Sequence, residues 1–168
     1  MTTQPSANEV KQHLEAAERS PREVAAAVSG LPEKTLLYKP SPEKWSMLEI
    51  LSHLADTEIV FAYRIRKILS ESAPEITGFP QDDWAKNLHY DQNVVPELVA
   101  LYGLNRHANL KLLRRATPAE LARTATNTTA NRTISLAEVI GQIDTHSAKH
   151  LKQIENLKHL MTNPHQVI

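Results

Sequence analysis

Two histidines four residues apart, His146 and His150, are the residues whose types and spacing most clearly indicate chemistry. They interrupt the apolar seam of a strongly helical segment, in which apolar positions recur at steps of three and four residues. The seam runs Val139, Ile143, His146, His150, Ile154 and Leu157. Because a buried imidazole without a partner costs a few kcal/mol, two in adjacent turns make sense if one ligand binds both. Side chains at i and i+4 project from the same helix face, so the pair favours a divalent metal.

A metal needs more than two ligands, and His53 is the strongest candidate for the third. It lies about two turns inside another long amphipathic segment, at the edge of an apolar stripe. If the two helices pack together, three imidazoles converge on one point. Three neutral histidines leave a tetrahedral or octahedral metal with open positions, which is typical of a catalytic site. The alternative is a set of core histidines that bond to nearby carbonyl groups, the commoner role of a lone buried histidine.

Several acidic side chains share the helical segment of His53, and most have two interpretations. Glu49 follows Ser46 by three residues, which favours a helix-capping carboxylate over a fourth metal ligand. Asp56 either faces solvent, touches the site, or accepts a hydrogen bond from an imidazole and so orients it. Glu58 points away from His53 by its helical angle and is predicted to be structural.

Two further side chains, Thr57 and Arg64, share the side of the helix that carries His53. Arg64 either binds an anionic group of a substrate at the mouth of the site or forms a surface ion pair. The two tryptophans are predicted to pack against apolar neighbours. Trp45 precedes a helix start and acts as a staple, and Trp84 joins the core, with the wall of a pocket as its alternative.

The remaining five histidines have no partner at ligand spacing. Three lie on helices among charged residues and are predicted to be exposed, and two lie in loop or tail contexts. The first group is His13, His107 and His159, and the second is His89 and His165.

Length and composition bound the class of protein. The 168 residues suit a single domain, 1–168, with loose tails at 1–6 and 162–168. Basic and acidic residues both number 19, so neither nucleic acid nor an anionic membrane is a predicted partner. The absence of cysteine excludes a disulfide framework, a zinc finger and a cysteine nucleophile. No stretch approaches the ~18 apolar residues of a membrane span, so a cytoplasmic location is predicted.

The helix signals predict an all-α four-helix bundle with short extra helical turns. Capping boxes, in which Ser or Thr precedes Glu by three residues, occur at Ser6–Glu9, Ser20–Glu23, Ser46–Glu49, Thr117–Glu120 and Ser135–Glu138. Long helices are predicted at 7–29 (broken near Ser20 and Pro21), 46–71, 93–115 and 136–161. Short helical turns are predicted at 32–37, 81–88 and 118–122, and loops at 72–80 and 123–134. Bundles build metal sites from core-facing side chains of different helices, which suits the three histidines.

Three short motifs, in this order and spacing, resemble the DinB/YfiT-like superfamily of small helical metalloenzymes. They are Lys44-Trp-Ser followed by Glu49-Ile-Leu-Ser-His-Leu-Ala-Asp-Thr-Glu58, then Asp83-Trp84, then Asp144-Thr-His-Ser-Ala-Lys-His-Leu-Lys-Gln-Ile154. The resemblance spans nearly the whole chain. It implies a bacterial four-helix bundle in which His53, His146 and His150 bind a divalent metal, usually zinc or nickel.

The same resemblance also bears on the class of reaction. Some relatives transfer low-molecular-weight bacterial thiols such as bacillithiol, others resemble mycothiol-dependent isomerases, and many are labelled as hydrolases. The predicted function is therefore a metal-dependent transferase with such a thiol as cosubstrate. One alternative is a hydrolase with a metal-activated water, although no carboxylate is placed as a general base. Another is a non-catalytic metal-binding or stress-response bundle.

The predicted partner is a small-molecule substrate, and self-association into a homodimer stays open. The substrate pocket is predicted beside the metal, bounded by residues 72–90. This is the longest stretch between two bundle helices, and it contains Phe79 and Trp84. An apolar wall of this kind would hold an electrophilic or acyl group.

Overall fold

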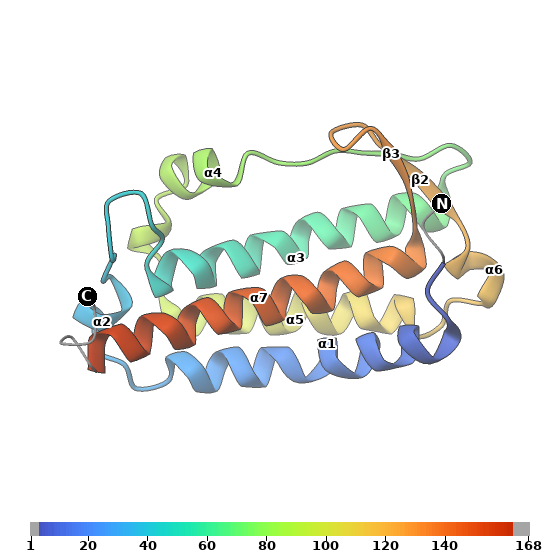
Figure 1. Cartoon of the computed structure of the whole chain (residues 1–168). Coiled ribbons are helices and arrows are strands. Elements are labelled where there is room, and N and C mark those ends of the chain that lie inside the picture. Colours follow the sequence, from blue (N-terminus) through green and yellow to red (C-terminus); the bar gives the residue numbers. More distant parts are fainter. Residues whose placement is uncertain (1–3, 163–168) are drawn as a thin grey trace.

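Four long helices form the body of the computed structural model, which describes residues 4–162 (Figure 1). They are α1 (Ala7–Val28), α3 (Met47–Ser70), α5 (Val95–Leu113) and α7 (Leu136–Thr162). Helix α3 packs between α5 and α7, and α1 packs against the same two helices from the other side. Helix α7 runs antiparallel to α3 (Figure 1). The predicted four-helix bundle is confirmed.

Capping boxes start the helices at four of the five predicted places. In each, the hydroxyl accepts from the backbone N–H three residues on, and the glutamate carboxylate accepts from the backbone N–H of the capping residue. The four pairs are Ser6–Glu9, Ser46–Glu49, Thr117–Glu120 and Ser135–Glu138. Ser6 therefore belongs to a helix cap, whereas most of the two predicted tails, with His165, lies outside the described residues.

The fifth box and the predicted helix break at Pro21 are wrong, because α1 is continuous through this proline. Proline has no N–H to donate to the carbonyl four residues earlier, which here is Ala17. That carbonyl instead accepts from the Ser20 hydroxyl at 3.0 Å and from Nη1 of Arg106 at 2.8 Å. Two side chains therefore replace the backbone bond that the proline removes, one of them from another helix.

Shorter elements connect the bundle helices. The predicted short turns correspond to α2 (Glu33–Leu36), α4 (Gln81–Asn87) and α6 (Pro118–Leu121), with a 3₁₀ turn η1 (Tyr90–Gln92) after α4. The loops predicted at 72–80 and 123–134 instead contain strands β1 (Glu75–Ile76), β2 (Thr124–Asn127) and β3 (Arg132–Ser135). Strand β2 pairs antiparallel with β3 and parallel with β1. These strands form because Ile76, Ala125 and Ile134 are buried against the core.

The apolar core consists of two clusters separated by a polar layer. One cluster lies towards the hairpin and contains Phe61, Ile65 and Ile140; the other contains Leu51 and Leu54. Between them, all four long helices place polar side chains inside the bundle. These are Ser20 from α1, Glu58 from α3, Tyr102, Arg106 and Asn109 from α5, and Ser147 from α7. We call this set the Arg106 network.

No helix of residues 4–162 is both long and apolar enough to cross a membrane.

Candidate metal centre

Three imidazoles converge between α3 and α7, from His53 on the first helix and His146 and His150 on the second. The Nε2 atom of His146 lies 3.0 Å from that of His53 and 3.1 Å from that of His150. Helix α3 starts at the Ser46 cap, which fixes its register, and the i, i+4 spacing on α7 places the other two rings side by side. The structure thus brings together the three histidines singled out in the sequence.

The donor set suits a divalent metal. Two ligands bound at about 2.1 Å on neighbouring positions of a metal are about 3 Å apart, close to the separations of these nitrogens. No other group of three or more His, Cys, Asp or Glu side chains within the described part of the chain has comparable geometry. The buried Nδ1 atoms of His53 and His150 have no hydrogen-bond partner there. The rings of His53 and His150 are therefore not core histidines that bond to carbonyl groups.

All three imidazoles are neutral at pH 7. Burial lowers the pKa of His53 to about 3, of His146 to about 2 and of His150 to about 4. The positive charge of nearby Lys149 lowers each pKa further. A neutral imidazole keeps a nitrogen lone pair for a metal, so the site is electrostatically ready to bind one without first losing protons.

Aromatic side chains form the walls of the centre. The ring of Trp45 lies 4.8 Å from that of His53 and stacks on His150 at 6.4 Å. Phe79 stacks on His53 at 5.8 Å, and Trp84 packs behind Phe79 at 4.7 Å. Trp45 also packs against the apolar core, as predicted. Its position over two histidines was missed, because nothing in its spacing from them points to a contact.

The acidic neighbours of His53 have structural roles. Glu49 caps α3 and pairs with Lys39 at 2.8 Å, so it is not a fourth ligand. Asp56 neither faces solvent nor orients an imidazole; it accepts a hydrogen bond of 2.5 Å from the Tyr90 hydroxyl. Burial, together with this bond, raises the pKa of Tyr90. Glu58 belongs to the Arg106 network, which confirms its predicted structural role.

One of the other histidines differs from its prediction. His13 is half-buried rather than exposed, and its Nδ1 lies 2.8 Å from a carboxylate oxygen of Asp144. His107 and His159 are exposed, as predicted. His89 is exposed and has a left-handed backbone, with φ of 52°, before η1.

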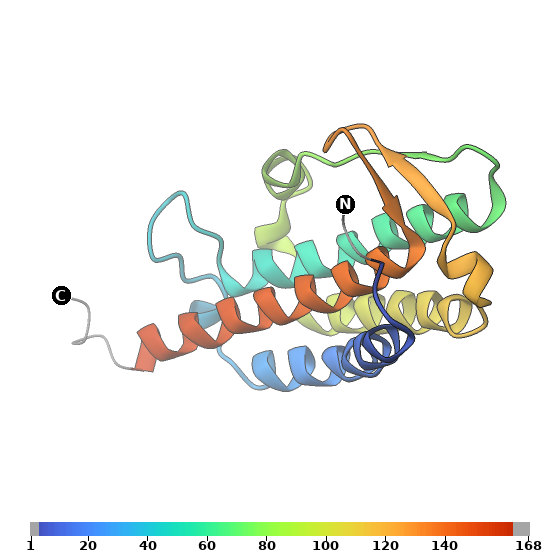
Figure 2. The ribbon, with the colours of Figure 1, turned by 45° about the vertical axis from the view of Figure 1, so that its right-hand side comes forward.

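Two neighbouring cavities touch the histidines. A cavity of about 430 Å³ runs along the groove between α3 and α7 and is lined by His53, Thr57, Phe61, Arg64, Phe79, Gln81, Gln142, Thr145, His146 and Lys149. The segment between α3 and α4 runs above α3 in the view of Figure 2, and it supplies Phe79 to the lining of this cavity. A second cavity, of about 480 Å³, is lined by His150 and shares Gln81 and Lys149 with the first. The predicted 72–90 segment therefore does bound a cavity at the histidines, with Trp84 behind its wall.

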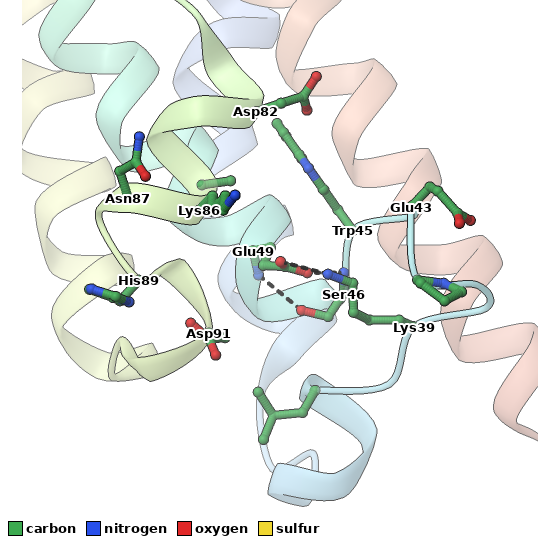
Figure 3. A pocket seen from close by; sticks show the side chains of 13 residues that line it. Lys39, Glu43, Trp45, Ser46, Glu49, Asp82, Lys86, Asn87, His89 and Asp91 are labelled. Carbon is green, nitrogen blue, oxygen red and sulfur yellow. Dashed lines mark hydrogen bonds and ion pairs between the residues drawn. The ribbon is translucent and has the colours of Figure 1, made fainter.

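A larger cavity, of about 870 Å³, lies between α4 and the segment before α3 (Figure 3). Trp45 lines it at one edge, and the capping pair Ser46 and Glu49 lies at its floor (Figure 3). None of the three converging histidines lines this cavity. The chemistry of the site is therefore assigned to the two smaller cavities, which contact them.

The fold and the site together define a class: a four-helix bundle with a three-histidine centre suited to a divalent metal. The chain belongs to the DinB superfamily, whose sequence profile matches residues 16–154.

Curated relatives align with most of this chain. A protein of Geobacillus thermodenitrificans, named as a presumed metal-dependent hydrolase, is 29% identical over 154 residues, which cover 90% of this chain and 85% of that protein. A protein of Geobacillus kaustophilus with a similar name is 27% identical over the same coverage.

Two solved structures share the fold. YfiT from Bacillus subtilis, described as a probable metal-dependent hydrolase with an unusual four-helix bundle topology, superposes with a TM-score of 0.90. The match covers 96% of this chain and 92% of YfiT at 20% identity. A mycothiol-dependent maleylpyruvate isomerase superposes with a TM-score of 0.70 at 11% identity, over 86% of this chain and 60% of the isomerase.

Proposed function

We propose that this protein is a metal-dependent enzyme that transfers a low-molecular-weight thiol to a small-molecule acceptor. The observation that carries the proposal is the convergence of three neutral imidazoles, two buried and one half-buried, at a point where two separate cavities meet. A transferase needs room for two substrates beside one reactive centre, and this arrangement provides it.

The three histidines would hold a zinc or nickel ion, which supplies Lewis acidity that lowers the pKa of a thiol or water at its open positions. Trp45 and Phe79 cover the rings of His53 and His150, which are 1% and 4% exposed, and so shield these two rings from bulk water. The burial that keeps the imidazoles neutral also strengthens electrostatic interactions within the site.

The lining of the 430 Å³ cavity favours a thiol over water as the nucleophile. It contains no carboxylate that could act as a general base for water. The 480 Å³ cavity has two, Glu43 and Asp82, and both also line the 870 Å³ cavity, which none of the three histidines lines. A thiol has an ordinary pKa of about 8.5, so it loses its proton at neutral pH more easily than water does and depends less on a general base. During transfer a sulfur–carbon bond forms, the bond from that carbon to its leaving group breaks with its electron pair, and the thiol proton passes to the leaving group or to solvent.

The two cavities differ in the partner they suit. The 480 Å³ cavity beside His150 has an apolar part, with Ile50 and Leu157, and a larger set of polar and charged side chains, such as Gln153 and Asn156, which suits the polar body of a thiol cosubstrate. The 430 Å³ cavity has Phe61 and Phe79 in its walls, which suit the carbon skeleton of an acceptor. The shared fold with a mycothiol-dependent isomerase is consistent with thiol chemistry on this scaffold.

Metal-dependent hydrolysis is the second candidate, and the names of the Geobacillus relatives favour it. It would use the same three histidines, with water in place of the thiol. The two candidates predict different requirements, since only the transferase needs an added thiol.

The test combines metal analysis with kinetics. Purified protein is analysed for zinc and nickel, then assayed with bacillithiol and monochlorobimane, an electrophile that fluoresces after conjugation. Conjugation that is lost on chelation and in His150→Ala, but not in His159→Ala on the same helix, supports the transferase. Thiol-independent cleavage of p-nitrophenyl acetate with the same metal requirement would favour the hydrolase. A stoichiometric metal without either activity would leave a non-catalytic metal-binding bundle.

A further inference from the structure

Arg64 has a half-buried positive charge and no ion pair among the described residues. Its Nη2 atom donates to the carbonyl oxygen of Thr77 at 2.5 Å. Its Nε atom is buried without a hydrogen-bond partner there, and burial lowers the pKa of the group. A cation taken partly out of water without a counter-charge is unfavourable, so Arg64 would gain from an anion that the protein itself does not supply.

The position of Arg64 connects this unpaired charge to the metal centre. His53, Thr57, Phe61 and Arg64 follow one face of α3 at steps of three and four residues, and all line the 430 Å³ cavity. Arg64 Cζ lies 6.0 Å from the ring centre of Phe61, and that ring lies 6.2 Å from His146. One aromatic ring thus separates the guanidinium from the metal ligands.

A second cation faces the same cavity from α7. Lys149 is exposed and forms no ion pair in the described structure, and it lines both cavities beside the histidines. The cavity lining includes these two cations and no acidic side chain. Because like charges that face one small space raise the potential inside it, the cavity attracts anions before any contact forms.

We propose that the acceptor substrate is a small organic acid, whose carboxylate binds Arg64 and Lys149 while its carbon skeleton lies along Phe61 and Phe79. The planar guanidinium pairs well with a carboxylate, and the arginine lies at a fixed distance along α3 from His53. Arg64 and Lys149 would then determine which acids are accepted and which end of the molecule faces the histidines. This inference rests on the proposed function, because it assigns the substrate class of the same site.

The proposal is tested by binding rather than by turnover. Hexanoate and hexanamide, which have the same chain length but differ in charge, are titrated into the full-length zinc-loaded protein by calorimetry or ligand-observed NMR. Hexanoate is expected to bind about tenfold or more tightly than hexanamide. Arg64→Gln, which removes the charge but keeps a donor for Thr77, should abolish most of this preference, and Lys149→Gln should reduce it.

Matched controls separate the site from the surface. Arg66→Gln changes an exposed arginine on the same helix, and Lys152→Gln changes an exposed lysine on α7; neither residue lines the cavity. Both variants should keep the full preference for hexanoate. A general effect of surface charge would lower it in all four variants, which would overturn the proposal.

Chelation distinguishes Arg64 from the metal as the binding partner. If the carboxylate binds Arg64 and Lys149, the preference persists after the metal is removed. A preference that survives Arg64→Gln and disappears on chelation would mean that the metal alone holds the acid, and this would overturn the proposal. So would the absence of any preference in the wild type. Each result is independent of the thiol assay, so the anion site and the transferase function can fail separately.

Discussion

Two buried polar clusters lie side by side in the middle of this bundle, and they differ in how their hydrogen bonds are satisfied. In the Arg106 network, Nη2 of Arg106 donates to Glu58 at 2.7 Å and to Ser147 at 2.9 Å, and Asn109 donates to Glu58. Only Nε of Arg106 lacks a partner within the described structure. In the histidine cluster, three nitrogens face one another and two more have no partner.

On α3 and α7, members of the two clusters are neighbours in the sequence. Glu58 follows Thr57 of the cavity on α3, and Ser147 follows His146 on α7. The same pair of helices therefore presents a satisfied network on one side and an unsatisfied cluster on the other. The difference indicates the role of each: a cluster that completes its own bonds holds the fold together, whereas one that does not is built for a ligand.

The largest expected effect comes from breaking the satisfied cluster. Arg106→Met should destabilise the protein by about 4 kcal/mol, because it leaves the Glu58 carboxylate buried without its cation. Urea denaturation measures the loss. The control is Arg114→Met, which removes an exposed pair with Glu18 and should cost far less than the loss of Arg106. Equal losses in the two variants would contradict the assigned role of the network.

The next effect comes from filling the unsatisfied cluster. Zinc at about 100 times its Kd should stabilise the wild type by about 3 kcal/mol, because it binds the folded state alone. Thermal denaturation with and without zinc measures the difference. His150→Ala should lose this stabilisation, while His159→Ala should keep it. Zinc stabilisation that is undiminished in His150→Ala would remove that residue from the site.

Acidification should weaken the metal-free protein through the same cluster. Burial lowers the pKa of His53 to about 3, of His146 to about 2 and of His150 to about 4. In the unfolded chain the pKa of a histidine is about 6.5. At a pH between the folded and unfolded pKa values, only the unfolded chain takes up protons, so the stability of the folded state falls as the pH falls. Three such groups should cost about 2 kcal/mol between pH 7 and pH 6.

Denaturation in EDTA at the two pH values checks this expectation. Replacement of His53 by Ala should reduce the pH dependence. Stability that stays constant from pH 7 to pH 6 would show that the three imidazoles are not held neutral.

The smallest effect has the opposite sign to the first. In the metal-free protein, His150→Leu should raise stability by about 1 kcal/mol, since an apolar side chain of similar size removes a buried nitrogen without a partner. Denaturation in EDTA at pH 7 provides the measurement. A loss comparable to that of Arg106→Met would mean that the two clusters play the same structural role.

The sequence made the histidine cluster visible because its members break an apolar seam at helical spacing. An imidazole among aliphatic residues is conspicuous, and i, i+4 spacing fixes which side chains lie together. Capping boxes and apolar periodicity likewise predicted the four long helices. These signals are local, so they can be recognised without knowledge of which helices pack together.

The Arg106 network could not be predicted in this way. Arg106 and Asn109 are polar residues on a helix, and their burial depends on Glu58 and Ser147, which lie far away in sequence. Without the fold, such residues resemble a solvent-exposed helix face. The hairpin was missed for a related reason: its threonines and asparagines indicate a loop, and only the contact of Ala125 and Ile134 with the core makes it a pair of strands.

Helix α1 also bears on the order in which the bundle assembles. The carbonyl of Ala17 has no backbone donor because of Pro21, and its remote partner is Arg106 on α5. Before the chain collapses, α1 is therefore weakened at its middle by the missing hydrogen bond. The Ala17 carbonyl gains its donor from Arg106 only when α5 packs against α1. The second half of α1 should therefore fold in the same cooperative step in which α5 docks.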